Sequence, residues 1–251
     1  QPLPRWKQIR FINHILTPSE KRFFWGSISV CMISLTIGIG LLIKPHLMEV
    51  PANGGTLTEA IVGTPKLINP LYAPLNDVDR DLGALIYSGL FRLDAQLEPQ
   101  PDLVESYEWR DNGRTLEIHL RKDARFHDNA RVTSDDVVFT YQAVRSSAWR
   151  SPLAATFRSI NAIRVDDTTV QLQMEKSNPQ IFTLGILPAH VWEDVPSGSA
   201  TLADINLRPI GSGPYQISTL RRDARGQILS YRLERFNGYY GIKPHIQEWQ
   251  F

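Results

Sequence analysis

An apolar run without charged side chains, residues 23–43, limits how this chain can fold more than any other feature. It reads FFWGSISVCMISLTIGIGLLI, and a helix of about 20 residues crosses a hydrocarbon core about 30 Å thick. Its eleven Leu, Ile, Phe and Val residues, each worth roughly 0.3 to 0.6 kcal/mol at a helix centre, outweigh its Ser, Thr and Gly. Residues 23–43 are therefore expected to span a lipid bilayer.

The charges on either side of the run predict its orientation. Five basic residues precede it against one acidic residue, Glu20, whereas only Lys44, His46 and Glu49 follow closely. Because positive loops stay in the cytoplasm, residues 1–22 are expected to be a cytoplasmic basic leader, with residues from about 50 onward extracellular or periplasmic. The basic residues of the leader are Arg5, Lys7, Arg10, Lys21 and Arg22.

Three other interpretations fit the run less well. A cleaved signal peptide usually has an apolar core of about 7 to 15 residues and a small-residue cleavage site, whereas this run is longer and ends at Lys44-Pro45-His46-Leu47. Cys31 suggests a lipoprotein, but Val30 stands where a lipid-attachment site needs a small residue. A buried core helix would carry a polar stripe. The sequence favours a single-pass anchor in the cell membrane.

Composition excludes several classes of function. The net charge is +1 and much of the basic excess lies in the leader, so no nucleic-acid partner is expected. Cys31 is the single cysteine, so the remaining domain has neither a disulfide nor a thiolate. We predict no cofactor. The chain begins with Gln1 and ends at Phe251 within an expected strand, so both ends look cut.

The rest of the chain is predicted to be one α+β domain, residues 55–251, after a Pro- and Gly-containing linker at residues 44–54. Residues 56–62 are a candidate strand, and a helix is expected from Asp79 to a glycine stop at Gly89. Alternating apolar residues predict half-buried antiparallel strands at residues 115–121 and 169–175.

Local turn and cap signals support this outline. Asp111-Asn112-Gly113 and Asp166-Asp167 are expected to turn one strand into the next, and a further strand is expected at residues 229–233. Thr133 is a candidate N-cap, with Asp135 and Asp136 in the first turn of the helix that follows.

Seven short motifs occur in order along residues 54–251. The first part contains GGTLTEAIVGTPKLINPLYA from Gly54, IYSGLF from Ile86 and PQPDLVES from Pro99. The fourth motif has two parts, FHDN from Phe126 and VTSDDVVFT from Val132. The later motifs are ILPAH from Ile186, GSGPY from Gly211 and FNGYYGIKP from Phe236.

This series resembles the extracellular solute-binding proteins of family 5, the oligopeptide- and dipeptide-binding components of ABC importers. The family pattern F-H-D-G then V-T-A-x-D-V-V-F-T is the most specific match, with Asn129 replacing the glycine; Asn tolerates positive φ. The resemblance implies the N-terminal lobe of a two-lobed, type II periplasmic-binding-protein-like (Venus-flytrap) fold, truncated before its second lobe. It also implies a noncatalytic protein that captures a peptide outside the membrane and delivers it to a membrane permease.

The resemblance places ligand contacts in the loop that follows the first strand, although a plain β-turn is an equally good interpretation. Family members that bind a peptide's amino end often have an acidic residue near Thr64, which this chain lacks. The expected contacts of this loop are Val62, Gly63, Thr64 and Pro65.

A second group of candidate ligand contacts comes from two other motifs. The GSGPY motif could bind an anion through backbone N–H groups, but a rigid turn is the stronger alternative. Tyr87 could stack on ligand or belong to the core, and His127 and Asp128 are expected to form a structural turn. The candidate contacts are Tyr87, Gly211, Ser212, Gly213 and Tyr215.

Alternative functions remain open at this point. Some family members carry nickel or haem, although His119, His190 and His245 lack metal-site spacing and no metal ligand is predicted. A ligand sensor could use the same module, but a leader of about 22 residues is too short for a signalling domain. A hydrolase would need an activated nucleophile, which the sequence does not indicate.

Overall fold

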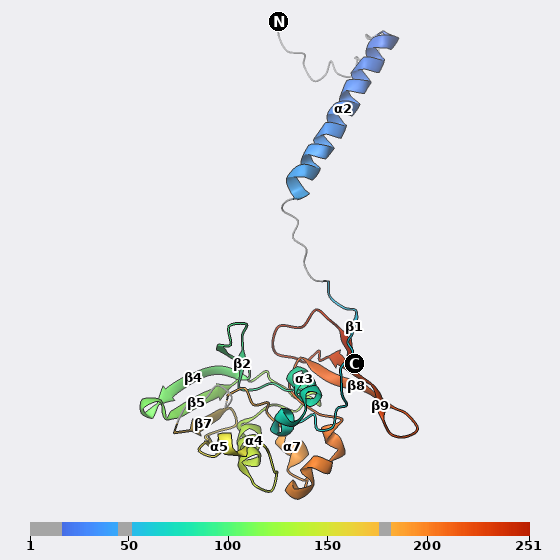
Figure 1. Cartoon of the computed structure of the whole chain (residues 1–251). Coiled ribbons are helices and arrows are strands. Elements are labelled where there is room, and N and C mark those ends of the chain that lie inside the picture. Colours follow the sequence, from blue (N-terminus) through green and yellow to red (C-terminus); the bar gives the residue numbers. More distant parts are fainter. Residues whose placement is uncertain (1–16, 45–51, 176–181) are drawn as a thin grey trace. The chain divides into compact units, whose positions relative to one another are not determined.

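The computed structural model describes residues 17–44, 52–175 and 182–251, and it divides into two units, residues 1–51 and 52–251 (Figure 1). Most of the expected leader and linker, residues 1–16 and 45–51, lies outside the described residues.

The first unit contains helix α2, Pro18–Ile43. It begins five residues before the apolar run because Pro18 suits the first helical turn and the Glu20 carboxylate accepts the Thr17 N–H at 2.8 Å. Among the described residues it is the one helix long and apolar enough to cross a membrane, and none of its residues is buried.

The first sheet of the second unit has the order β1-β10-β9-β8. Strand β1 is parallel to β10, whereas β10-β9 and β9-β8 are antiparallel. The expected strand at residues 56–62 is too long: the residues of β1 that pair with β10 end at Thr58, which lies opposite Gln250. The strands are β1 Thr56–Thr58, β8 Tyr215–Arg222, β9 Ile228–Arg235 and β10 Glu248–Gln250.

The second four-stranded sheet is wholly antiparallel, with the order β4-β5-β7-β6. Its two expected turns are confirmed: residues 111–113 join β4 to β5, with Asn112 at φ 54° and Gly113 at φ 83°, and Asp166 accepts the Thr168 N–H before β7. A two-stranded sheet, β2-β3, precedes β4 in the sequence. The strands are β2 Phe91–Leu93, β3 Pro99–Pro101, β4 Val104–Arg110, β5 Thr115–Leu120, β6 Asn161–Arg164 and β7 Thr169–Gln173.

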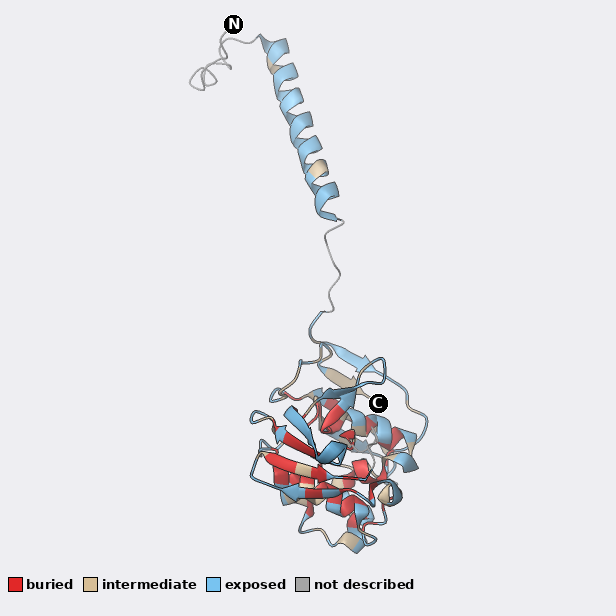
Figure 2. Ribbon diagram, turned by 90° about the vertical axis from the view of Figure 1, so that its left-hand side faces the viewer, coloured by how far each residue is buried: buried red, intermediate tan, exposed pale blue. Residues whose placement is uncertain are grey.

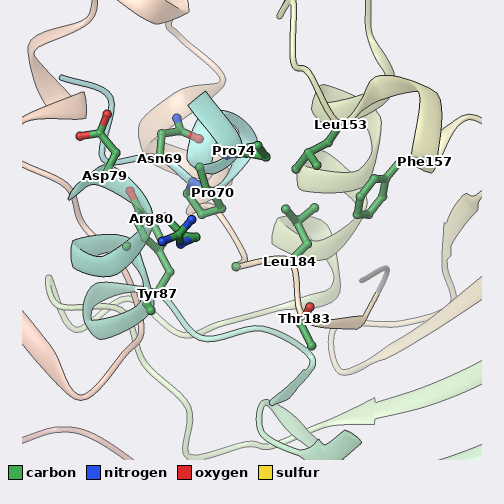
Figure 3. A pocket seen from close by; sticks show the side chains of 14 residues that line it. Asn69, Pro70, Pro74, Asp79, Arg80, Tyr87, Leu153, Phe157, Thr183 and Leu184 are labelled. Atoms are coloured by element: carbon green, nitrogen blue, oxygen red, sulfur yellow. The ribbon is translucent and has the colours of Figure 1, made fainter. Parts of the chain in front are cut away.

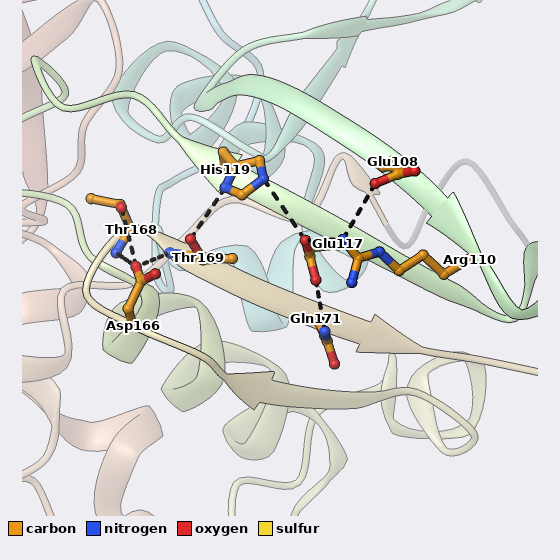
Figure 4. A network of polar contacts seen from close by, with 8 residues as sticks. All are labelled: Glu108, Arg110, Glu117, His119, Asp166, Thr168, Thr169 and Gln171. Atoms are coloured by element: carbon orange, nitrogen blue, oxygen red, sulfur yellow. Dashed lines mark hydrogen bonds and ion pairs between the residues drawn. The ribbon is translucent and has the colours of Figure 1, made fainter.

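One face of this second sheet carries a polar network (Figure 4). Glu117 accepts hydrogen bonds from Arg110 and Gln171, each at 2.7 Å, while His119 Nδ1 lies 3.2 Å from Thr169 Oγ1. The partners explain why Glu117 is only 8 % exposed although it alternates with the buried Leu116 and Ile118. His119 therefore belongs to a cross-strand network.

The helices pack on these sheets. Helix α4, Ser134–Arg145, packs on β6 and β7, and its expected start is confirmed. Thr133 and Asp136 form a capping box, in which the Asp136 carboxylate accepts both the Thr133 hydroxyl and the Thr133 N–H, the latter at 2.8 Å. The shorter helices are α5 Ala154–Phe157, α7 Ala189–Trp192, η3 Pro70–Leu75, η4 Asp111–Gly113, η5 Ser197–Leu202 and η6 Asp204–Asn206.

Helix α3, Asp77–Ile86, is central to the second unit because it packs against both η3 and β8. It starts earlier than expected, since Asn76 caps it by accepting the Val78 N–H at 3.1 Å. It also ends before Gly89, because residues from Tyr87 onward are extended and Gly89 pairs with Gly185. A single cluster of buried apolar side chains contains residues of α3 and of both large sheets. Figure 2 colours the buried residues red along the ribbon.

Candidate functional site

A pocket of about 250 Å³ opens beside helix α3 (Figure 3). Its walls come from η3, α3, α5 and the segment before α7, and we call it the α3 pocket. Most of its lining is apolar. The lining residues are Asn69, Pro70, Ala73, Pro74, Asp79, Arg80, Gly83, Ala84, Tyr87, Leu153, Phe157, Thr183, Leu184 and Gly185.

The turn into η3, at Asn69 and Pro70, forms one wall of the pocket. Asn69 accepts the Leu71 N–H at 2.9 Å and so caps η3, while Pro70 occupies its first turn. The Asn69 amide also donates to Asn206 Oδ1 at 3.4 Å, which ties this turn to η6. Asn69 is 1 % exposed, so its polar atoms are used for structure.

Two charged residues line the pocket within the described part of the chain, and both already make polar contacts inside the protein. Asp79 is 2 % exposed and accepts the Lys66 N–H at 2.8 Å, the Leu67 N–H at 2.9 Å and an Asn76 amide hydrogen at 3.1 Å. These bonds anchor the loop that precedes η3 to the first turn of α3.

Arg80 is the second charged residue, and it lies at the edge of the pocket. Its guanidinium contacts Asp77 at 2.6 Å and Asp81 at 3.3 Å, and the side chain is 56 % exposed. These nearby carboxylates raise the Arg80 pKa further, so its positive charge is permanent.

Two glycines control the width of the pocket. A Cβ on Gly185 would lie 2.8 Å from both Pro70 Cγ and Tyr87 Cβ. The segment before α7 therefore contacts η3 and the end of α3 at this point. A Cβ on Gly83 would meet nothing within 4 Å. Glycine therefore closes one end of the pocket by contact and leaves space above the helix at the other.

Tyr87 is the one predicted contact residue that lines the pocket. Its side chain is 6 % exposed and its hydroxyl donates to the Ile68 carbonyl oxygen at 3.4 Å. Burial raises its pKa, so it stays a neutral phenol. Tyr87 thus supports the pocket wall from within the core.

The predicted contact loop, residues 62–65, lies next to the start of α3. Val62 is fully exposed, Gly63 has φ 126° and approaches Val78, and the Thr64 carbonyl accepts an Asn76 amide hydrogen at 3.0 Å. Pro65 is buried. The exposed part of the loop is therefore held by its backbone, with the Val62 side chain free in solvent.

Residues 211–215 lie against the other end of α3 and do not line the pocket. A Cβ on Gly211 would lie 2.1 Å from the Ile86 carbonyl oxygen, and the Gly213 N–H donates to that oxygen at 2.8 Å. Ser212 is fully buried, and the Tyr215 hydroxyl donates to Ile246. The tight approach favours the rigid-turn interpretation of this motif.

His127 holds the same turn from the opposite side. Its Nδ1 accepts the Gly211 N–H at 3.2 Å, its Nε2 lies 3.2 Å from the Gly213 carbonyl, and its own N–H donates to Gly211 at 2.8 Å. Only a neutral ring protonated on Nε2 satisfies both ring contacts. Burial lowers the His127 pKa to about 4. The Gly211 and Gly213 N–H groups, two of the donors that an anion nest would use, are thus both engaged within the protein.

His190 and Asp128 form a separate pair, with Nε2 2.7 Å from Oδ2. Asp128 also accepts the Ala130 N–H at 3.0 Å, as expected of a local turn. Among the described residues no group of three His, Cys, Asp or Glu side chains is placed to hold a metal ion.

Sequence reasoning missed most of the pocket. Leu153, Phe157 and the segment at residues 183–185 come from parts of the chain with no motif pointing to a ligand. The turn at Asn69-Pro70 was visible as a motif, but only as the end of a loop. The sequence could not identify Gly83, because the empty space next to its Cα depends on how the surrounding segments pack.

Comparison with known proteins identifies the fold. The model for bacterial extracellular solute-binding proteins, family 5 Middle, matches residues 98–251, more than half of the chain. The chain belongs to this family. As a family 5 protein it is a solute-binding protein and not an enzyme, which confirms both expectations.

Two curated relatives illustrate the match. The chain is 28% identical over 203 residues to the oligopeptide-binding protein AppA of Bacillus subtilis, covering 78% of this chain and 36% of that protein. It is 26% identical over 237 residues to the dipeptide-binding protein of Escherichia coli, covering 84% and 43%. This family 5 chain therefore spans less than half the length of these relatives.

Solved structures agree. AppA from Bacillus subtilis in complex with a nonapeptide matches with a TM-score of 0.72 and 27% identity, covering 80% of this chain and 40% of that one. NikZ from Campylobacter jejuni, at 22% identity and a TM-score of 0.64, shares the fold. The α+β mixed sheets of this family 5 protein thus match part of a periplasmic binding protein.

The His127 contacts predict a pH-dependent loss of stability. Because the folded pKa is about 4 and the unfolded value is about 6.5, the unfolded chain binds a proton first as pH falls. The free energy of unfolding should therefore drop by up to about 3 kcal/mol between about pH 6.5 and 4. Denaturant titrations of the wild type and His127→Gln at several pH values measure the slope of the free energy of unfolding against pH.

The variant should be less stable at pH 7 but should show a shallower decline below pH 6.5. His245→Gln, which alters an exposed histidine, is the matched control and should keep the wild-type slope. A slope unchanged in His127→Gln would contradict the role assigned to this ring.

Proposed function

We propose that this chain is the N-terminal part of a binding protein that captures peptides outside the membrane for an ABC importer. Family membership and the peptide-binding relatives support this proposal. The observation that carries it is the α3 pocket, an open, mostly apolar hollow of about 250 Å³ beside a helix held at both ends. A membrane permease is the proposed partner that receives the peptide.

A second lobe is proposed to complete the site. The α3 pocket is smaller than the roughly 300 to 1,000 Å³ usual for drug-sized ligands, so it can hold only a small part of a peptide. The solved relatives are more than twice as long as the matched region. We infer that residues 55–251 form the N-terminal lobe of a two-lobed fold, and that hinge closure brings the missing wall over the ligand.

Main-chain pairing is proposed to supply much of the affinity. An extended peptide presents a repeating pattern of N–H and C=O groups, and a partner that pairs with them tolerates many side chains. Such a site binds peptides of varied sequence, and the α3 pocket contacts one residue of the peptide.

The proposed domain order places the binding unit outside the cell. Residues 1–22 would form the cytoplasmic leader, residues 23–43 an uncleaved transmembrane anchor, and residues 44–54 the linker to the binding domain. The apolar length of α2 and the basic residues before it support this proposal.

Full-length protein is expected to bind short peptides saturably, whereas the chain ending at Phe251 should bind at least about 100-fold more weakly, because only one wall of the closed site is present. Isothermal titration calorimetry with peptides of three to nine residues measures both affinities. Equal, tight binding by the shorter chain would contradict the two-lobe proposal.

The loop at residues 62–65 is proposed to touch the ligand through its exposed part. Val62→Asp should weaken peptide binding about tenfold or more by placing an unpaired charge against the ligand, with the melting temperature unchanged because Val62 is fully exposed. Leu202→Asp, which changes another exposed apolar residue, is the control. Equal peptide affinities of the two variants would show that Val62 does not contact the ligand.

An uncleaved anchor predicts that the mature protein keeps residues 1–43 and stays in membranes washed with alkaline carbonate. Mass spectrometry of the membrane fraction should recover peptides from residues 1–22. A mature chain that starts after Ile43 would show instead that the run is a cleaved signal.

A further inference from the structure

We propose that the α3 pocket receives one uncharged, apolar side chain of the bound peptide and rejects charged side chains of either sign. This inference rests on the proposed function and adds the chemistry that the site selects. It follows from the walls of the pocket, its volume, the pairing of its charges and the open space above Gly83.

The walls offer apolar contact on both sides (Figure 3). Pro70 and Pro74 face the pocket from η3, while Leu153 and Phe157 line it from α5 and the residue before it. Leu184 adds a further aliphatic group. An apolar side chain that enters loses contact with water on several sides at once, which is the favourable step in hydrophobic binding.

The volume matches one side chain. A cavity of about 150 Å³ lined by aliphatic and aromatic groups holds a benzene molecule. The α3 pocket, at about 250 Å³, therefore has room for a leucine or phenylalanine side chain but not for a second residue. The pocket ends at Tyr87 and Gly185, because a Cβ on Gly185 would already touch both Tyr87 and Pro70.

The charges of the pocket are not available to a ligand. Asp79 is 2 % exposed, with its carboxylate bonded to two backbone N–H groups and the Asn76 amide, and Arg80 contacts Asp77 and Asp81. A lysine or glutamate side chain that entered would lose its water without gaining an unpaired counter-charge. Burial of an unpaired charge is costly, so the pocket discriminates against both signs.

Gly83 provides a direct way to fill the pocket. It lines the hollow from the middle of α3, and a side chain there meets no atom within 4 Å of its Cβ. Leucine and alanine both favour helix over glycine, so both variants should fold. Gly83→Leu puts the proposed ligand group into the pocket covalently, while Gly83→Ala leaves most of the space empty.

The test uses the full-length protein in detergent and alanine pentapeptides with a single Phe, Leu, Gln, Lys or Glu, placed in turn at each of the five positions. Calorimetry gives the affinities, and thermal melting confirms that each variant is folded. At one peptide position, Phe and Leu should bind about tenfold or more tightly than Lys and Glu, with Gln between them.

In Gly83→Leu, the preference for Phe and Leu over Lys and Glu at that position should disappear, because the leucine occupies the space that the peptide side chain would fill. Gly83→Ala should retain the preference. Pentapeptides that bind equally whatever their varied residue, or a preference that survives Gly83→Leu, would overturn the inference and leave peptide binding standing. Failure of every pentapeptide to bind the wild type would instead overturn the proposed function.

Discussion

Helix α3 is the part on which the rest of the binding unit depends, because contacts at its two ends position separate loops. At its first turn, the buried Asp79 carboxylate takes the N–H groups of Lys66 and Leu67. At its last turn, the Ile86 carbonyl accepts the Gly213 N–H. A carboxylate buried with several donors holds its partners strongly. One ten-residue helix thus relates the loop before η3 to the turn before β8.

Close backbone approach explains the glycine-containing turn at residues 211–215. Gly211 leaves no space for a Cβ beside Ile86, so this turn is set by packing. His127 closes it from the other side with two ring contacts that need the neutral imidazole. Burial lowers its pKa and keeps that form at neutral pH. A motif that suggests catalysis or anion binding therefore serves to lock a turn against a helix.

The α3 pocket follows from this arrangement. A Cβ on Gly185 would lie 2.8 Å from both Pro70 and the buried Tyr87, and the two charged side chains of the pocket are engaged in contacts within the protein. What remains for a ligand is apolar surface. A wall of this kind can select a side chain without fixing the rest of the peptide, which is consistent with the peptide-binding relatives of the family. The chain covers 40% of the solved AppA structure, so the opposite wall is proposed to come from a second lobe.

Local patterns in the sequence determined the apolar helix α2, the hairpin turn at residues 111–113, the alternating strands β5 and β7, and the start of α4. Each depends on residues a few positions apart, and the ordered motifs identified the family. Tertiary structure decided the partner of β1, because β1 pairs in parallel with β10, which lies far from it in the sequence. It also decided the α3 pocket, whose walls come from distant segments, and the empty space above Gly83. Such features depend on which surfaces pack together, and side-chain periodicity carries no record of that.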